Sequence, residues 1–397
     1  MKPIKITEGI YWVGAIDWNI RDFHGYSTYE GSTYNAFLIL DEKIVLIDTV
    51  KKEFFNELIA RISYIVDPKS IDYVISNHTE MDHSGALPEI MDIIGINKPI
   101  YCSKMGKKNL SMHFSNNFNY IDVNNGQELT IGKRTIKFIE TRMIHWPDSM
   151  FSYLIEEGIL FSSDAFGQHY ASTERFDYLI DKHIIMSHAK KYFANIILPY
   201  TSLVLKLLNT LQNMDLKIEM ICPDHGILWK SKDGISRIIT AYKNWSEHKP
   251  EKKVLIIYDT MWHSTEKMAE IIGEAIAEEG IHVKLMELRK WHRSDIMTEI
   301  LDSQAVIIGS PTINNGLFPT VSDFLTYMKG LKPKNKIAAA FGSYGWSGEA
   351  VKLINKELEK MNLTIIDDGL KIQFVPNKEK MISCYEYGKK IVSFLVN

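Results

Sequence analysis

Two imidazoles and two carboxylates stand within six residues of this chain, in His78-Thr79-Glu80-Met81-Asp82-His83. The cluster directly follows residues 73–76, an apolar run that is typical of a β-strand. Nitrogen and carboxylate donors together suit iron, zinc or manganese. Two His and two acids have little reason to crowd at a strand end unless a metal neutralises and orders them. Four donors so close together therefore predict a site for two metal ions rather than one.

A two-metal site needs further ligands, and three candidates follow or end apolar runs later in the chain. These are His145, Asp164 and His225. A strand ending at each of them would deliver a side chain to a shared edge. A single His or Asp among apolar residues is more often a core or capping residue. Spacing alone therefore leaves both interpretations open for these three positions.

The bulk composition limits the classes of function. A chain of 397 residues is too long for one ordinary core, so two domains are expected. The formal net charge of −3 gives no reason to expect binding to nucleic acid or anionic lipid. No secretory h-region follows Met1, and no apolar run is long enough to span a bilayer, so a soluble cytoplasmic protein is predicted.

Cysteine usage argues against three further kinds of site. The three cysteines, Cys102, Cys222 and Cys384, are far apart and form no C-x-x-C pair. This spacing disfavours a disulfide framework, a rubredoxin-type iron site and an iron–sulfur cluster. We interpret all three as small buried residues.

Residues 1–249 form the first predicted domain, made of short strands with helices placed later in each half. Asp41-Glu42 lies between two apolar runs, which is typical of a hairpin. A charged, proline-containing segment at 242–253 is interpreted as the linker. The predicted strands are 34–40, 43–48, 73–76, 136–138, 151–155 and 159–162, and the predicted helices are 52–65 and 204–211.

Residues 250–397 form the second predicted domain, in which strands and helices alternate. This alternation predicts a doubly wound parallel sheet. The predicted strands are 254–258, 283–287, 305–309, 337–341 and 369–374. The predicted helices are 267–279, 322–329, 348–361 and 379–396.

A second candidate site lies in this domain, in the loop Asp259–Thr265 between the first strand and the first helix. Its hydroxyl and backbone N–H groups lie at a helix N-terminus, where anions bind. The sequence has no P-loop lysine and no G-x-G-x-x-G, so ATP and NAD are poor candidates. A terminal monophosphate fits, although helix capping by the same Ser and Thr is the competing interpretation.

Two more loops, 310–316 and 342–348, follow the third and fourth strands. Open α/β sheets bind ligands at the carboxyl ends of strands. Glycine lets the backbone approach a ring, and Trp262, Tyr344 and Trp346 offer flat faces for stacking, unless they are ordinary surface aromatics. The three loops together favour FMN. The predicted FMN contacts are Thr260, Met261, Trp262, His263, Ser264, Thr265, Pro311, Thr312, Ile313, Asn314, Asn315, Ser343, Tyr344, Gly345, Trp346, Ser347 and Gly348.

With its H-x-E-x-D-H motif and this domain order, the chain resembles the flavodiiron proteins, also called A-type flavoproteins, over essentially its whole length. The resemblance implies an α/β architecture, in which a metallo-β-lactamase-like αββα domain at 1–249 is followed by a flavodoxin-like doubly wound parallel sheet at 250–397. The motif is specific, because most hydrolases of the β-lactamase superfamily carry His where Glu80 stands. The positions of the three later ligand candidates also fit the family.

The resemblance implies a role for each candidate residue of the first domain. His78, Glu80 and His145 would hold one iron, Asp82, His83 and His225 would hold the other, and Asp164 would bridge them. Asp48, at the end of its strand, resembles the acid that steadies the metal loop. His24 and Tyr192 are the candidates for a His and a Tyr near the open face of the iron pair. The roles of Gln168 and His169 are left open.

The resemblance also implies an activity and its partners. FMN and two non-haem irons would reduce O2 to water in oxygen detoxification, or couple two NO to N2O. Flavin and irons of one chain would be too far apart, so a head-to-tail homodimer or a dimer of dimers is expected. The chain ends at Asn397 without an appended rubredoxin or flavin reductase module. Electrons would then come from an external donor, rubredoxin or a reduced deazaflavin.

Two other functions compete with this interpretation. A di-zinc thioesterase or lactonase fused to a flavodoxin domain would use a metal-bound hydroxide. Glu80 argues against it, because a second carboxylate near the metals favours iron redox chemistry. A plain electron carrier would need FMN alone, and the seven candidate ligands argue against it. The sequence does not decide between O2 and NO.

Overall fold

The computed structural model describes residues 1–115 and 118–395, and these divide into two compact units. The first unit comprises Met1–His24, Thr28–Phe193 and Tyr200–Lys243. The second comprises Gly25–Ser27, Ala194–Pro199 and Asn244–Asn397. The predicted domain boundary at 249/250 stays a prediction.

The first unit contains a seven-stranded mixed sheet in the order β1-β2-β7-β8-β9-β10-β11. The predicted hairpin is confirmed, because Phe37 pairs with Ile47 and Ile39 with Val45 in antiparallel register. From β8 onward the neighbours are parallel. The strands are β1 (Ile4–Thr7), β2 (Ile10–Trp12), β7 (Phe37–Ile39), β8 (Val45–Ile47), β9 (Tyr73–Ser76), β10 (Ile100–Ser103) and β11 (Tyr120–Val123).

A second sheet of five strands, in the order β12 to β16, packs against the first. Side chains from both sheets, including Trp12, Phe37, Phe138 and Phe161, form one buried apolar cluster between them. The strands are β12 (Glu128–Thr130), β13 (Thr135–Glu140), β14 (Met150–Leu154), β15 (Ile159–Phe161) and β16 (Met220–Cys222). Shorter strands lie outside the two sheets: β3 (Ala15–Asp17), β4 (Asp22–Phe23), β5 (Tyr26–Ser27) and β6 (Ser32–Tyr34).

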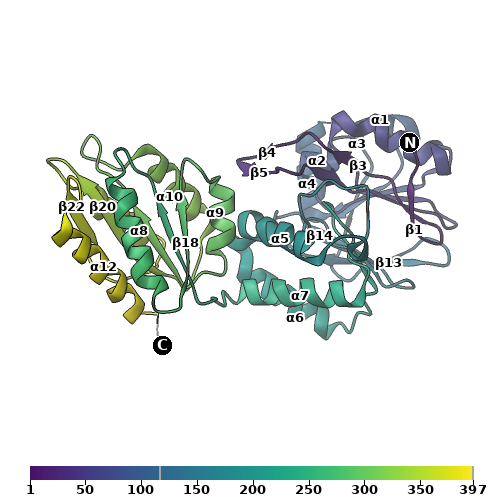
Figure 1. Cartoon of the computed structure of the whole chain (residues 1–397). Helices are drawn as coiled ribbons and strands as arrows, with labels where there is room; N and C mark the ends of the chain where they lie inside the picture. The colour runs from purple at the N-terminus through teal and green to yellow at the C-terminus, as the bar shows by residue number, and fades with distance from the viewer. Residues whose placement is uncertain (116–117, 396–397) are drawn as a thin grey trace. The chain divides into compact units, whose positions relative to one another are not determined.

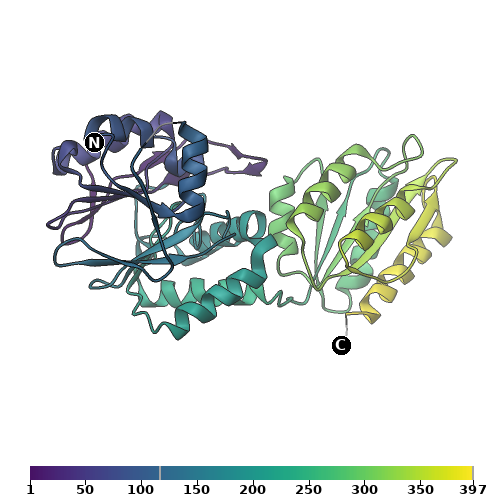
Figure 2. The same cartoon turned by 180° about the vertical axis from the view of Figure 1, so that it is seen from behind.

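Helices cover the outer faces of both sheets, which gives the expected αββα arrangement (Figures 1 and 2). Leu58, Ile62, Ile90 and Leu110 pack into a second apolar cluster with the first sheet. The helices on that side are α1 (Phe55–Ile65), α3 (Leu87–Ile94) and α4 (Lys104–Phe114), and those on the side of the second sheet include α5 (Lys182–Tyr192), α6 (Thr201–Asn213) and α7 (Lys232–Ser246).

Helix α7 corrects the predicted linker at 242–253. The helix continues to Ser246, and β17 begins at Lys253, so the irregular segment is shorter than predicted. Ile238 and Tyr242 are fully buried and anchor the helix. The charged residues that follow Tyr242 concealed this last helical turn in the sequence pattern.

One helical stretch, Lys182–Asn213, is long and apolar enough to cross a membrane by length and composition. Length and composition alone do not contradict the sequence prediction that no run spans a bilayer. The core helix of a soluble protein satisfies the same test, and 44% of the most apolar window is buried inside the structure. The stretch is weak evidence for a membrane span.

The second unit is built on a parallel sheet in the order β18-β17-β19-β20-β21, with β22 also pairing with β20. This is the flavodoxin-like strand order, with the switch point between β17 and β19. The strands are β17 (Lys253–Tyr258), β18 (His282–Glu287), β19 (Ala305–Gly309), β20 (Ile337–Tyr344), β21 (Thr364–Ile365) and β22 (Leu370–Gln373).

Helices lie on both faces of this sheet, so the doubly wound prediction is confirmed (Figures 1 and 2). Helix α9 and strand β21 were not predicted. The apolar residues of α9 extend over little more than one turn, which is too short for a clear period. The predicted last helix reached Val396, which lies outside the described residues. The helices are α8 (Ser264–Ala277), α9 (Arg293–Ile300), α10 (Pro319–Leu331), α11 (Ala350–Lys360) and α12 (Lys378–Ser393).

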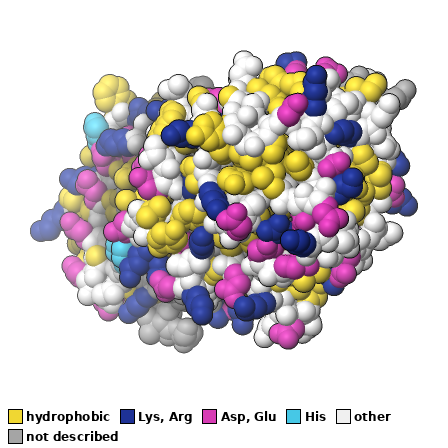
Figure 3. All heavy atoms as spheres, turned by 90° about the vertical axis from the view of Figure 1, so that its right-hand side faces the viewer, with side chains coloured by type: hydrophobic (Ala, Val, Ile, Leu, Met, Phe, Trp, Pro, Cys, Tyr) yellow, Lys and Arg dark blue, Asp and Glu magenta, His cyan; other side chains and the backbone are white. Residues whose placement is uncertain are grey.

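The face of the first unit seen in Figure 3 carries Lys and Arg side chains interspersed with Asp and Glu. Hydrophobic side chains lie between the charged ones. Together with the formal net charge of −3, this mixture gives no electrostatic reason to expect nucleic acid on that face.

Candidate functional site

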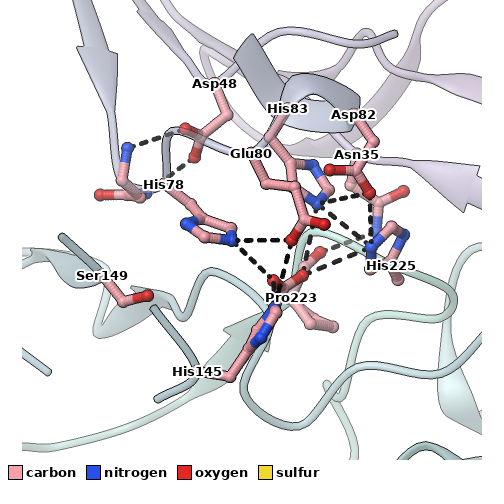
Figure 4. A network of polar contacts seen from close by, with 12 residues as sticks. Asn35, Asp48, His78, Glu80, Asp82, His83, His145, Ser149, Pro223 and His225 are labelled. Carbon is pink, nitrogen blue, oxygen red and sulfur yellow. Dashed lines mark hydrogen bonds and ion pairs between the residues drawn. The ribbon is translucent and has the colours of Figure 1, made fainter. Parts of the chain in front are cut away.

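The seven predicted metal ligands converge at the ends of strands from both sheets of the first unit. The loop after β9 carries His78 and Glu80, and the short helix α2 (Met81–Ser84) carries Asp82 and His83. The other ligands follow strands of the second sheet: His145 lies between β13 and β14, Asp164 follows β15, and His225 follows β16. Figure 4 shows the side chains of six of these ligands pointing toward one another: His78, Glu80, Asp82, His83, His145 and His225.

One half of the cluster contains His78, Glu80 and His145, with one oxygen of Asp164 between them. The Nε2 atoms of His78 and His145 each lie 3.3 Å from Glu80 Oε2. The same two nitrogens lie 3.2 Å and 2.8 Å from Asp164 Oδ2. Four donor atoms therefore face one small space, and they can hold one metal ion.

The other half contains Asp82, His83 and His225, with the second oxygen of Asp164. The Nε2 atoms of His83 and His225 lie 3.3 Å and 3.1 Å from Asp82 Oδ2. They lie 3.3 Å and 3.4 Å from Asp164 Oδ1. Each half thus faces a different oxygen of Asp164, which is the geometry expected of a bridging carboxylate.

Hydrogen bonds alone do not satisfy the nitrogen and oxygen atoms of this cluster, and bound cations would. The Nε2 atoms of His83 and His225 face each other at 3.1 Å. Both carboxylate oxygens of Asp82 and Oδ1 of Asp164 are buried and have no hydrogen-bond partner among the described residues. Lone pairs that converge without enough protons between them are what a metal ion requires.

The electrostatics of the cluster also favour bound positive charge. Burial opposes charge on His78 and His145, but hydrogen bonds with the neighbouring carboxylates outweigh it and raise both pKa values, that of His145 to about 9. Burial raises the pKa of the Asp164 carboxyl, but His83, His145 and His78 outweigh this and hold it well below its usual range. The acids therefore stay ionised when positive charge lies beside them.

Asp148 orients one metal-facing histidine, and sequence reasoning assigned it no role. Asp148 Oδ2 lies 3.3 Å from His78 Nδ1 and accepts a hydrogen bond of 2.8 Å from the Thr79 N–H. Asn109 Nδ2 donates to Asp148 Oδ1 at 3.1 Å. A carboxylate on the far ring nitrogen fixes the tautomer and directs Nε2 to the metal. The only sequence signal was its place three residues after His145.

The remaining loops are also fixed by buried polar groups. Thr33 O lies 2.7 Å from His225 Nδ1, so this histidine too presents Nε2 to the cluster. Asp48 accepts hydrogen bonds of 2.8 Å and 2.9 Å from the backbone N–H and side-chain amide of Asn77. Burial raises the pKa of Asp48 to about 6. The carboxyl of Asp48 thereby holds the residue before His78, as expected for an acid that steadies the loop.

The two residues predicted near the open face differ in exposure. The His24 side chain is 78% exposed, and its Nε2 lies 3.8 Å from Glu80 Oε1. Tyr192 is buried, with its ring centroid 5.9 Å from that of His225. The His169 ring packs against both, with its centroid 5.1 Å from that of Tyr192 and 4.6 Å from that of His225. His169 Nδ1 lies 2.7 Å from Ser32 Oγ, and His169 belongs to neither half of the cluster.

A pocket of about 500 Å³ lies in the second unit, at the carboxyl ends of its strands. Most of the predicted FMN contacts line it. Four of the predicted contacts do not line it: Thr260, His263, Thr265 and Gly348. Thr265 Oγ1 instead forms a hydrogen bond of 2.8 Å with Oγ of the lining residue Ser343. Two unpredicted residues, Phe374 and Val375, complete the lining, because the segment after β22 returns to this edge. The lining residues are Met261, Trp262, Ser264, Pro311, Thr312, Ile313, Asn314, Asn315, Ser343, Tyr344, Gly345, Trp346, Ser347, Phe374 and Val375.

The rim of this pocket suits a planar ring with a polar tail. The side chains of Trp262 and Trp346 are 85% and 90% exposed, and exposed flat apolar faces of this size mark ligand or partner sites. Ser264 starts helix α8, whose first backbone N–H groups can bind a phosphate. A flavin mononucleotide has both parts.

Comparison with known proteins agrees with these two sites. Residues 33–226 match the family described as ODP family beta lactamase, and residues 256–388 match the flavodoxin family. A relative named nitric oxide reductase, from Moorella thermoacetica, is 47% identical, with 99% of this chain and 98% of the relative covered.

Solved structures show the same likeness over the whole chain. Rubredoxin oxygen oxidoreductase from the anaerobe Desulfovibrio gigas gives a TM-score of 0.97 at 44% identity, covering 99% of this chain and 98% of that one. The flavodiiron protein from Giardia intestinalis gives a TM-score of 0.95 at 34% identity, covering 100% and 98%. The chain therefore belongs to the flavodiiron protein family, oxidoreductases with FMN in a flavodoxin domain and a non-haem iron pair in a β-lactamase-like domain.

Proposed function

We propose that the chain reduces O2 to water at an iron pair held by the seven converging side chains. His78, Glu80 and His145 would hold one iron, and we call these three residues the first subsite. Asp82, His83 and His225 would hold the other iron and are called the second subsite, and Asp164 would contribute one oxygen to each. The observation that carries this assignment is the division of the two Asp164 oxygens between the two halves of the cluster.

Reduction of O2 to two waters takes four electrons and four protons. When bound, the iron pair supplies two electrons to the gas and FMN supplies two more. The protein orients the ligands: Asp148 and Thr33 hold the far ring nitrogens of His78 and His225. His24 and Tyr192 are proposed to border the gas-binding face.

Reduction of two NO to N2O and water is the alternative activity at the same site, and it needs two electrons and two protons. The relative named nitric oxide reductase favours it, and the structure named rubredoxin oxygen oxidoreductase favours O2. Every proposed ligand serves either gas. A di-zinc hydrolase is the weaker alternative, because the flavodoxin pocket would have no task in it.

Rubredoxin is the proposed electron donor, supported by the name of the Desulfovibrio gigas protein, with a reduced deazaflavin as the alternative. A head-to-tail homodimer or a dimer of dimers, in which the flavin of one chain serves the irons of the next, is proposed from the family resemblance. The cytoplasm is the proposed location.

Anaerobic turnover of the iron- and FMN-loaded protein tests this function. Reduced rubredoxin is the donor, a reduced deazaflavin replaces it in a parallel series, and O2 and NO are supplied in separate runs. Rapid consumption of O2 with slow consumption of NO is the expected result. The reverse preference assigns the NO activity. Consumption of neither gas by protein that carries two zincs would refute the proposal in favour of a hydrolase.

A further inference from the structure

The loop Pro223–Ile227, which carries His225, is held from two sides by buried side-chain amides. Asn35 lies on one side, between strands β6 and β7, and Gln168 lies on the other, four residues after Asp164. Both side chains are fully buried. Figure 4 shows Asn35 and Pro223 beside His225.

Every polar group of the Asn35 side chain is used. Its Nδ2 donates to Pro223 O at 2.7 Å and to Gly226 O at 3.1 Å. Its Oδ1 accepts from Trp12 Nε1 at 2.8 Å and from Thr33 Oγ1 at 2.9 Å. Only this orientation works, because a flipped amide would set its oxygen against two carbonyls and its NH2 against two donors.

Gln168 holds the following residue of the loop by the same means. Its Oε1 accepts a hydrogen bond of 2.7 Å from Ile227 N, and its Nε2 donates to Phe166 O at 3.0 Å and to Ile227 O at 3.3 Å. The contact is tight, because a Cβ added at Gly226 would lie 2.2 Å from Gln168 Oε1. Gly226 also has a φ of +79°, so glycine is required there on two grounds.

We propose that Asn35 and Gln168 are positioning residues that fix His225, and with it the second subsite, to the rest of the metal centre. Neither side chain is among the metal-facing groups. The Asn35 side chain bonds loop backbone on both sides of His225, at Pro223 and Gly226, and the Gln168 side chain bonds it at Ile227, two residues after His225. The inference rests on the proposed ligand assignment, and it gives Gln168 a role in the loop rather than at the open face.

Iron retention against a chelator, with 57Fe Mössbauer spectra of the iron- and FMN-loaded protein, tests the proposal. Asn35→Asp keeps the volume and the oxygen facing Trp12, but places an oxygen against Pro223 O and Gly226 O. Asn35→Ala and Gln168→Ala remove the amides. Loss of a supporting partner typically lowers metal affinity about 10- to 100-fold. In each variant we expect half of the iron to be lost at a chelator concentration roughly tenfold lower than in the wild type. The iron should be lost from one Mössbauer component, and the FMN content should not change.

Asn109→Ala is the control, because it removes a partly buried amide that bonds Asp148 and does not touch this loop. It should keep both spectral components. Unchanged chelator resistance in all three variants would refute the proposal. So would equal loss of both components together with a lower melting temperature, since that indicates general destabilisation. If the alanine variants do not fold, Asn35→Asp decides. Wild-type protein that binds two metals without reducing gas would overturn the proposed function alone.

Discussion

Removal of the Asp148 carboxylate tests the supporting network of the first subsite. In Asp148→Ala, His78 Nδ1 and the Thr79 N–H lose their acceptor in a site where both residues are fully buried. The imidazole can then turn or change tautomer, so Nε2 is no longer fixed toward the metal. Asn109 loses only a partner at the edge of the network.

The size of the effect follows from these contacts. A supporting carboxylate is worth about 10- to 100-fold in metal affinity, which corresponds to about 1.4–2.7 kcal/mol. The two orphaned donors add a cost to the free energy of unfolding of about 1–3 kcal/mol each. Asp148→Asn keeps the volume and one acceptor oxygen, so its iron affinity should fall about tenfold.

Chelator titration of the iron-loaded protein with 57Fe Mössbauer detection measures these effects. Asp148→Ala should lose the first-subsite component first, and Asn109→Ala should lie within about threefold of wild type, because its hydrogen bond contacts no ligand. Urea denaturation of metal-free protein separates the folding cost from the metal affinity. Equal chelator resistance in Asp148→Ala and the wild type would refute the reasoning. It would also be refuted if Asp148→Ala first lost the same Mössbauer component as the Asn35 variants.

Three further predictions follow from the structure. His83→Asn should leave FMN reducible by the donor but abolish gas consumption, which spectrophotometry and a gas electrode measure separately; unchanged turnover would contradict the ligand assignment. Trp346→Ala removes an exposed stacking face and should weaken FMN binding by about 0.5–1.5 kcal/mol, measured by flavin fluorescence against an unchanged iron content. Burial, with Lys336 and Lys334 nearby, lowers the pKa of His248 to about 4, against about 6.5 unfolded. The unfolded chain therefore binds more protons between these values, and stability falls as the pH drops from about 6.5 toward 4. His248→Gln should remove about 1–2 kcal/mol of this loss, a value already reduced for solvent screening. Urea denaturation of the variant and the wild type at pH 7 and pH 5 measures the loss of stability in each protein, and an equal loss in both would contradict the prediction.

The metal cluster could be predicted from the sequence because four of its ligands are close together in the chain. His78 and Glu80 follow a strand whose apolar run is unmistakable, and Asp82 and His83 complete the motif. Position alone left His145, Asp164 and His225 ambiguous, and the family resemblance supplied their roles. The structure brings all seven together because the loops that follow β9, β15 and β16 and the loop between β13 and β14 converge, although β9 belongs to one sheet and the other strands to the second.

The supporting groups could not be predicted, because they act across long sequence distances without a local pattern. Asn35 lies 188 residues from Pro223, and Thr33 lies 192 residues from His225. Their contacts use backbone carbonyls, which every residue has. Phe374 joins the flavin pocket only because β22 pairs with β20. Such contacts appear only once the strands are placed.

Glu80 is where this metal centre departs from the hydrolases that share its fold. With Glu80, Asp82 and Asp164 ionised, the ligand set brings three negative charges to two metal ions. A histidine in place of Glu80 would leave two. Hard anionic oxygen donors stabilise the more highly charged state of a metal relative to the less charged one. The extra carboxylate therefore favours a pair of metal ions that can be oxidised, as iron can and zinc cannot. The flavodoxin unit that follows in the sequence, with a pocket for a redox cofactor, is consistent with the same requirement.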